Sequence, residues 1–203
     1  MKPNKIMKGM RSVLCFLFLM SSHLYAQDYY QSVNDGSSQL LRSSLHNLID
    51  NHNVLSYESC KQHLQNTDMD PNDTDNIILI YKQNSVDAAW DGGETWNREH
   101  VWAASYGLYD SDAYSDLHNL KPADPSVNSS KGNKNFDNGG TQHDEALQCF
   151  YTENTWEPAD AVKGDVARIL FYMDVRYDGS GEDPNLAVTE LLNSVYGVPN
   201  HFL

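Results

Sequence analysis

The segment WNREHVW, residues 96–102, is the part of the chain around which the other segments can be organised. Its two tryptophans and its valine predict a partly buried strand that carries Glu99 next to His100. A carboxylate is a hard oxygen ligand suited to Mg²⁺, and an imidazole titrates near neutral pH. In a regular strand these two side chains point to opposite faces, so they serve one site only if the chain twists or bulges there.

Two later segments bring further polar groups to the same region. SDLHNL, residues 115–120, contains His118 and Asn119, and VN, residues 127–128, adds the amide oxygen of Asn128 as a neutral ligand. A strand is expected over residues 117–120, paired with a strand over 95–102. The prolines and capping side chains of residues 122–126 then predict the start of a helix. Strand, loop, strand and helix could converge on one ion, which indicates a one-metal hydrolytic site.

The first 26 residues have the composition of an export signal. Four positive residues, Lys2, Lys5, Lys8 and Arg11, precede an apolar run over residues 13–20, and Ala26 ends the segment. Since this run is shorter than the about 20 residues needed to cross a bilayer, we expect a removable signal peptide and no membrane contact after its removal. Residues 27–203 would then form one domain of 177 residues, located in the periplasm or outside the cell.

The charge of the chain is acidic. The formal net charge is −14, and removal of the four positive charges in residues 1–26 would change it to −18. Such acidity is unexpected for a nucleic-acid binder, because Lys and Arg supply much of the affinity for phosphates. Four basic residues nevertheless lie close in sequence to the candidate site: Arg98, Lys121, Lys131 and Lys134. We interpret the acidity as favouring solubility, and the sequence indicates no protein partner.

Two cysteines, Cys60 and Cys149, would remain after signal removal. In an oxidising compartment such a pair is compatible with one disulfide, which would join the segment before the site to the segment after it. The alternative is two separate buried thiols.

The remaining pattern predicts helices on both sides of the site. Leucines at helical spacing and candidate caps at Asp35, Ser37 and Ser38 predict a mainly helical region over residues 27–67. The other expected elements are an acidic turn over 68–76, a buried strand over 77–81, a turn over 91–94, loops over 105–115 and 133–142, and helices over 155–177 and 184–195. Arg168 interrupts the apolar face of the first of these helices. It is either a partly buried structural residue paired with Asp165 or Glu157, or a phosphate ligand.

Four blocks of residues carry a resemblance to a known family. They are NREHVW at 97–102, DLHNLKPAD at 116–124, VNS at 127–129 with KGN at 131–133, and KGDVAR at 163–168 with FYM at 171–173. In this order, from about Tyr81 to Tyr177, the chain resembles the bacterial endonuclease I family, exported non-specific nucleases built on the ββα-metal (His-Me finger) motif. The resemblance implies an α+β fold, and we expect a mostly helical single domain around that motif.

The resemblance also implies roles for individual residues. It makes His100 the general base and Glu99 and Asn128 the ligands of one Mg²⁺, with an activated water attacking the phosphate in line to leave a 5′-phosphate. Arg98, Lys131 and Arg168 are the residues expected to contact substrate. His118 and Asn119 match the second strand and are assigned a supporting role. The expected partner is DNA, with RNA as the alternative, because cleavage directed at the backbone carries no signature of base reading.

The chain departs from the family pattern at three places. Ala103 and Ala104 stand where the family usually has a proline and often a basic residue, and Lys131 stands where an arginine is common. Lysine keeps the charge but loses bidentate phosphate contact. The asparagine- and arginine-rich end of the family is also absent. These departures support an alternative hypothesis, a weakened or inactive member that binds nucleic acid without cleaving it. A third hypothesis is a structural domain stabilised by calcium at the acidic loop near Asp70.

Overall fold

The computed structural model describes residues 29–188 and divides the chain into two compact units, before and after the boundary between Asn51 and His52. The predicted signal peptide, residues 1–26, lies outside the described residues. The described part of the first unit contains helix α2, Ser38–Ile49. The side chain of Ser37 accepts a hydrogen bond from the backbone nitrogen of Leu40 at 3.2 Å, which confirms Ser37 as the helix cap.

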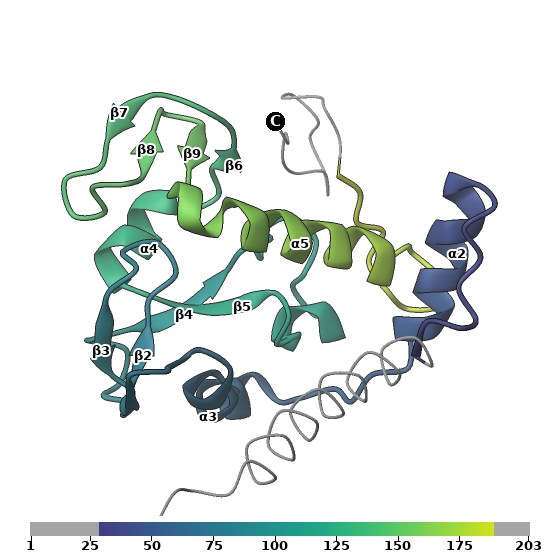
Figure 1. Ribbon diagram of the computed structural model, residues 1–203, viewed down its shortest axis with the longest axis horizontal. Helices are drawn as coiled ribbons and strands as arrows, with labels where there is room; N and C mark the ends of the chain where they lie inside the picture. The colour runs from purple at the N-terminus through teal and green to yellow at the C-terminus, as the bar shows by residue number, and fades with distance from the viewer. Residues whose placement is uncertain (1–28, 189–203) are drawn as a thin grey trace, which may run out of the picture. The chain divides into compact units, whose positions relative to one another are not determined.

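The second unit is built around a short antiparallel ribbon of two strands, β4 (Asn97–His100) and β5 (Leu120–Ala123). Helix α3, Tyr57–Thr67, lies on one side of this ribbon, and helix α5, Asp160–Arg176, lies on the other (Figure 1). Helix α4, Pro125–Lys131, follows β5 directly. The order of strand, loop, strand and helix predicted around the site is therefore observed.

Two apolar clusters hold this unit together. The α3 side contains Cys60, Leu64, Ile77, Leu79, Trp96 and Leu120, all buried. The α5 side is larger and joins helix residues such as Val166 and Leu170 to strand and loop residues that include Tyr81, Val101, Trp102, Val127 and Trp156. The ribbon thus lies between the two apolar clusters, with one face packed against the α3 cluster and the other against the α5 cluster.

The remaining strands form two further small sheets. One is an antiparallel sheet of β1 (Met69–Asp70), β2 (Asp73–Ile78) and β3 (Ser85–Asp87). The other has the order β6 (Asn135–Phe136), β9 (Thr155–Glu157), β8 (Phe150–Tyr151) and β7 (Thr141–Gln142). The α+β class is confirmed. The expectation of a mostly helical chain is wrong, because helices of 12, 11, 7 and 17 residues make up less than a third of residues 29–188.

The start of α4 was predicted correctly, whereas the strand before it is displaced. The carboxylate of Asp124 accepts hydrogen bonds from the nitrogens of Ser126 and Val127 at 3.0 and 3.2 Å, and Pro125 is the first helical residue. The strand expected over 117–120 begins only at Leu120. Asp116 accepts a bond from the nitrogen of His118 at 2.9 Å, which folds residues 117–119 into a turn.

Other predicted boundaries also differ. The loop expected over 133–142 contains β6 and β7, and the helix expected from residue 155 begins at Asp160, after β9. The strand expected over 77–81 ends at Ile78. Residues 184–188 of the last predicted helix are not helical, and the rest of that prediction lies outside the described residues. Within residues 29–188, helices are all too short or too polar to span a bilayer.

Candidate functional site

The pairing of β4 with β5 is regular through the residues of the candidate site. Asn97 lies opposite Ala123, Glu99 opposite Lys121 and His100 opposite Leu120, without a bulge. Because side chains alternate along a strand, Asn97 and Glu99 share one face of the ribbon and His100 lies on the other. The twist or bulge that would turn both Glu99 and His100 to one face is not observed within the ribbon.

Glu99 is held in a buried cluster of polar groups. It is 3% exposed, and its Oε1 accepts a hydrogen bond from the hydroxyl of Tyr81 at 2.7 Å. The ammonium of Lys131, itself 1% exposed, lies 3.2 Å from the same oxygen and also donates to the carbonyl of Val101. Burial raises the pKa of Glu99, while Lys131 and Tyr81 act in the opposite direction. An internal cation therefore balances the carboxylate.

Asn128 reaches the same face of the ribbon from α4. Its Nδ2 donates to the side-chain oxygen of Asn97 at 2.6 Å and lies 3.5 Å from the carbonyl oxygen of Arg98. The amide nitrogen thus fixes the side chain against β4, and the amide oxygen is the atom with metal-ligating chemistry. The structure brings Asn128 and Lys131 of α4 to the face that carries Glu99.

His100 lies on the opposite face of the ribbon. Its Nε2 lies 2.8 Å from the carbonyl oxygen of Tyr114, and its ring stacks on Tyr57 with centroids 5.6 Å apart. Burial lowers the pKa of His100 to about 4, and the charges of Lys131 and Arg98 lower it as well, against the effect of the Tyr114 carbonyl. Since a carbonyl only accepts, this bond requires a proton on Nε2, and the neutral ring then keeps an unprotonated Nδ1.

The three cations predicted to contact substrate lie in different surroundings. The guanidinium carbon of Arg98 is 3.7 Å from the ring centroid of Tyr57, and its NH1 donates to the Tyr57 carbonyl at 2.5 Å. Lys131 is buried with Glu99, as described above. The Arg168 side chain is 75% exposed, so the expectation of partial burial is wrong, but its pairing with Asp165 at 2.5 Å is observed. Of these three, Arg168 has the solvent-facing charge.

Asn119 and His118, the two residues predicted to have a supporting role, also differ in their exposure to solvent. Asn119 is fully buried, and its amide accepts from the nitrogen of Trp102 at 2.7 Å and donates to the Trp102 carbonyl at 3.1 Å. It therefore fixes the backbone just after β4. The side chain of His118 is 68% exposed, and its ring stacks on Tyr172 with centroids 4.4 Å apart.

Asp116 is a polar residue of this region that the sequence pattern did not single out. It is 4% exposed and accepts hydrogen bonds from the hydroxyls of Tyr172 and Tyr177 at 2.9 and 2.8 Å. Its other oxygen lies 3.2 Å from Nδ1 of His118. Burial acts to raise the pKa of Asp116, but bonds from His118, Tyr177 and Tyr172 lower it below its ordinary value. The sequence could have indicated this turn, because an aspartate side chain commonly accepts a hydrogen bond from the backbone nitrogen two residues later, here that of His118.

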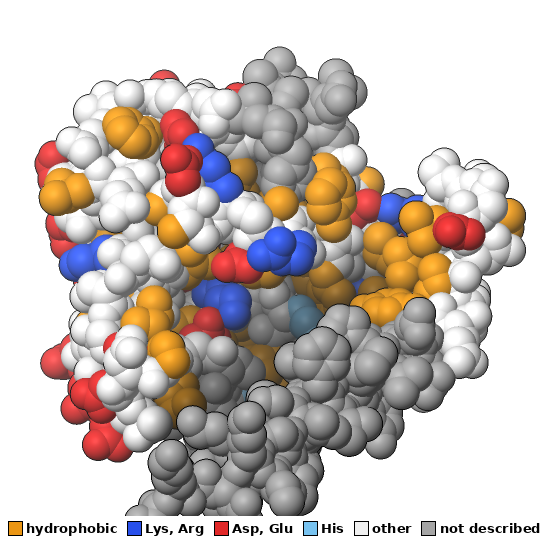
Figure 2. Space-filling view, viewed as in Figure 1, with side chains coloured by type: hydrophobic (Ala, Val, Ile, Leu, Met, Phe, Trp, Pro, Cys, Tyr) orange, Lys and Arg blue, Asp and Glu red, His pale blue; other side chains and the backbone are white. Residues whose placement is uncertain are grey.

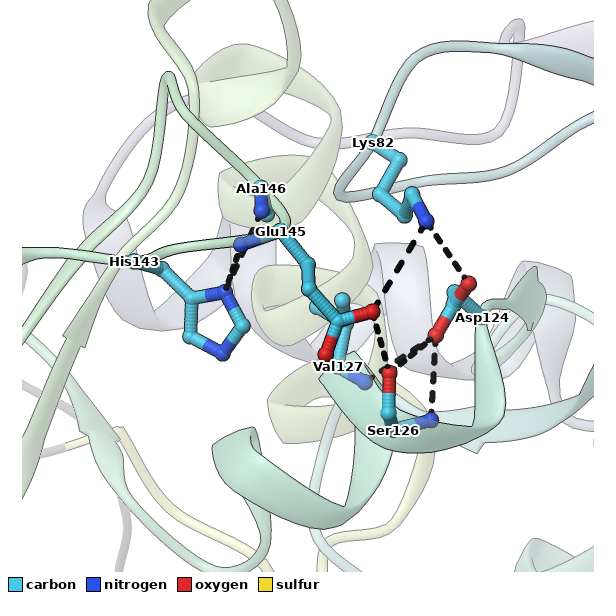
Figure 3. A network of polar contacts seen from close by, with 7 residues as sticks. All are labelled: Lys82, Asp124, Ser126, Val127, His143, Glu145 and Ala146. Carbon is cyan, nitrogen blue, oxygen red and sulfur yellow. Dashed lines mark hydrogen bonds and ion pairs between the residues drawn. The ribbon is translucent and has the colours of Figure 1, made fainter.

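A second polar cluster fixes the start of α4 (Figure 3). Its members are Lys82, Asp124, Ser126, Val127, His143, Glu145 and Ala146. The ammonium of Lys82 lies 2.9 Å from Asp124 and 4.0 Å from Glu145, and the hydroxyl of Ser126 lies between those two carboxylates at 2.7 and 2.8 Å. Because Asp124 caps α4, this cluster sets the position of the helix that carries Asn128.

The predicted disulfide between Cys60 and Cys149 is not formed, since both residues are free and buried. The thiol of Cys60 donates to the carbonyl of Ser115 at 3.3 Å, and that of Cys149 donates to the carbonyl of Tyr81 at 3.4 Å. The two thiols belong to the two different apolar clusters of the unit, so the alternative of separate buried thiols is correct.

Across residues 29–188, three or more His, Cys, Asp and Glu side chains do not gather into a metal-binding group.

A carboxylate, an amide and an imidazole on a strand pair and the helix that follows it define a candidate hydrolytic site. Comparison with known proteins identifies its family. The family model described as Endonuclease I matches residues 37–196, and the chain therefore belongs to the endonuclease I family, as its sequence blocks predicted.

Two curated relatives are each named "Extracellular ribonuclease". The protein of Bacillus amyloliquefaciens is 45% identical over 168 residues, which cover 81% of this chain and 58% of the relative. The protein of Bacillus subtilis (strain 168) is 41% identical over 186 residues, which cover 90% of this chain and 65% of the relative. The chain thus spans less than two thirds of the length of these relatives.

Proposed function

We propose that this protein is a secreted, Mg²⁺-dependent, sequence-nonspecific endonuclease that hydrolyses phosphodiester bonds to 5′-phosphate products. Membership of the endonuclease I family supports the reaction class, and the name of the two relatives supports secretion. The same name makes RNA a candidate substrate beside DNA. The strand, strand and helix order of β4, β5 and α4 agrees with a ββα-metal motif. The observation that carries the proposal is the environment of His100.

The fixed tautomer and the neutral form of His100 support the role of general base that we propose for it. The Tyr114 carbonyl 2.8 Å from Nε2 fixes the tautomer, so the lone pair of Nδ1 is the one that accepts a proton from water. With a pKa of about 4, the ring is almost entirely neutral at pH 7. When the cleavage rate is plotted against pH, we therefore expect the rate to fall only as pH approaches the pKa of this ring, well below the ordinary histidine value of 6.5.

The donor set on the other face of the ribbon fits a hard divalent ion. Glu99 offers a carboxylate and Asn128 an amide oxygen, the ligand types that Mg²⁺ prefers, from two elements that are in contact. When bound there, Mg²⁺ supplies electrostatic stabilisation of the phosphate and of the leaving oxygen. Lys131 lies 3.2 Å from the carboxylate of Glu99 and acts to lower its pKa, against the larger effect of burial, which raises it. The proposal requires the scissile phosphate to lie at the end of β4, where groups from both faces of the ribbon can approach it.

The Lys131–Glu99 pair also favours the second candidate, a binding protein that does not cleave. The ammonium 3.2 Å from Oε1 and the Tyr81 hydroxyl 2.7 Å from it already satisfy this carboxylate oxygen. In that case nucleic acid would bind without cleavage, and Mg²⁺ would change neither stability nor binding.

Plasmid nicking tests the proposal directly. Purified residues 27–203 should convert supercoiled plasmid to nicked and linear forms with Mg²⁺ and should stop when a chelator is added. His100→Ala should lose at least about a hundredfold in rate, the usual contribution of a positioned general base. His63→Ala is the matched control, because His63 is an exposed residue of α3. No cleavage by the parent protein, or equal cleavage by His100→Ala, would exclude the proposed site.

A further inference from the structure

A cavity of about 570 Å³ lies beside the ribbon on its α5 side, outside the residues assigned above to metal binding and proton transfer. Ile78, Ile80 and Ile169 give it an apolar lining. Lys121, Arg168 and His118 contribute its main polar groups, together with carboxylates. Figure 2 shows a hollow on this face, bordered by basic and acidic side chains with a histidine beside them. Its size and mixed lining are typical of a small-molecule site.

The charges around this cavity cancel. Lys121 lies 2.8 Å from Asp68, and Arg168 lies 2.5 Å from Asp165, so each cation on the cavity wall has its own carboxylate. A phosphate entering here would have to break one of these pairs. An uncharged flat ring with polar edges would instead cover the isoleucines and leave both pairs in place.

His118 offers such a ring a stacking surface at the edge of the cavity. Its side chain is 68% exposed, yet its position is fixed by Tyr172 on one side and by the buried carboxylate of Asp116. Asp116 also bonds to the backbone nitrogen of His118 at 2.9 Å. A ring held in one orientation while it faces solvent is a suitable platform for a base, since every base has a π face.

The cavity begins next to the proposed cleavage site. Lys121 of its wall is paired with Glu99 across the β4–β5 ribbon, and directly opposite residues of an antiparallel pair have Cβ atoms about 5 Å apart. A nucleotide whose phosphate lies near Glu99 can therefore place its base, or that of its neighbour, toward this cavity.

We propose that the cavity is a base-binding subsite, which takes up one unpaired nucleobase of the substrate strand and stacks it against His118. This inference rests on the proposed function and adds a preference to it. Single strands present unpaired bases, whereas a base in a duplex must first leave the stack at a cost of a few kcal/mol. The protein should therefore bind and cleave single-stranded nucleic acid better than duplex of the same sequence.

Ala161 allows the cavity to be filled without altering the core, because it lines the cavity and is exposed on α5. Fluorescence anisotropy with chelator present would compare a short labelled single-stranded oligonucleotide with its duplex. Ala161→Trp should weaken single-strand binding about tenfold, the loss expected for one stacked base, and leave duplex binding unchanged. Ala89→Trp is the matched control, since Ala89 is also exposed but lies outside the cavity.

His118→Ala is a second variant that tests the stacking surface itself, and because the His118 side chain is exposed, its removal leaves the core intact. It should also weaken single-strand binding selectively. Equal loss on single strand and duplex, or no loss in either variant, overturns the base-binding subsite. The control variant Ala89→Trp should still nick plasmid with Mg²⁺. Failure of the parent protein to nick would instead remove the proposed function, so the two failures are distinguishable.

Discussion

Replacement of Lys131 by methionine separates a purely structural role of Glu99 from a metal-binding role. The side chains of Lys131 and Glu99 are 1% and 4% exposed, so the variant leaves a buried carboxylate without its cation. Removal of one partner of such a pair costs about 3 to 5 kcal/mol of unfolding free energy. For a domain of this size that corresponds to a melting temperature lower by about 10 °C.

If Glu99 is a ligand for Mg²⁺, the ion replaces the lost ammonium as its partner. Thermal unfolding of Lys131→Met, followed by circular dichroism with chelator and then with Mg²⁺, should show a rise in melting temperature with Mg²⁺ that is larger than the rise in the parent protein. The double variant Lys131→Met, Glu99→Gln should recover stability without Mg²⁺, because the unpaired charge is gone.

Lys121→Met is the matched control for this experiment. Lys121 also pairs with a carboxylate, that of Asp68, but their side chains are 25% and 11% exposed. A loss of about 1 kcal/mol, and the same response to Mg²⁺ as in the parent protein, are expected for this partly solvated pair. The reasoning is refuted if Lys131→Met is as stable as Lys121→Met, or if Mg²⁺ raises the melting temperature of both variants equally.

Three further predictions concern the surroundings of the site. Because the folded-state pKa of His100 is about 4 and its ordinary value is 6.5, its contribution to stability is present above pH 6.5 and is lost as pH falls toward 4. Denaturant titrations should show about 3 kcal/mol of this loss in the parent protein and its absence in His100→Gln; identical pH dependence would contradict it. Asn119→Ala should lose about 2 to 4 kcal/mol, measured by urea unfolding, because it leaves two backbone groups of Trp102 unpaired; a loss under 1 kcal/mol would be inconsistent with that. Reductant should not change the melting temperature of residues 27–203, and the unreduced, denatured chain should titrate two thiols, Cys60 and Cys149; titration of none would indicate a disulfide.

The elements predicted well from sequence are those set by local interactions. The Ser37 cap and the Asp124–Pro125 start of α4 depend on side chains within three residues of the groups they bind, so the sequence contains all that is needed. The strand Leu120–Ala123 was displaced because Asp116 forms a local turn that competes with the ladder. Strands of two or three residues, such as β6 to β9, are too short to show any periodicity.

The sequence proposes members for the candidate site but does not give the contacts that surround them. Glu99, His100 and Asn128 were proposed from their chemistry and from the resemblance of blocks. Strand alternation correctly predicts opposite faces of β4 for Glu99 and His100, but neither source gives the partners of these side chains. The pairs that set their environments, Tyr81 with Glu99 and Tyr114 with His100, join residues 18 and 14 positions apart through tertiary packing. The burial of Lys131 likewise follows from the docking of α4 on β4, and its sequence neighbours give no sign of it.

The pairing of the basic residues changes how the acidity of the chain bears on nucleic-acid binding. Lys82, Lys121, Lys131 and Arg168 each lie within 3.2 Å of a carboxylate. Few cations near the ribbon are therefore available to displace counterions from phosphates, the usual source of affinity for nucleic acid. Affinity must then come from contacts other than free basic side chains. The proposed metal ion, shared with the phosphate, and the proposed stacking of a base in the cavity would be two such contacts. A single strand would make both contacts at once, whereas a duplex would make the second only after it opens.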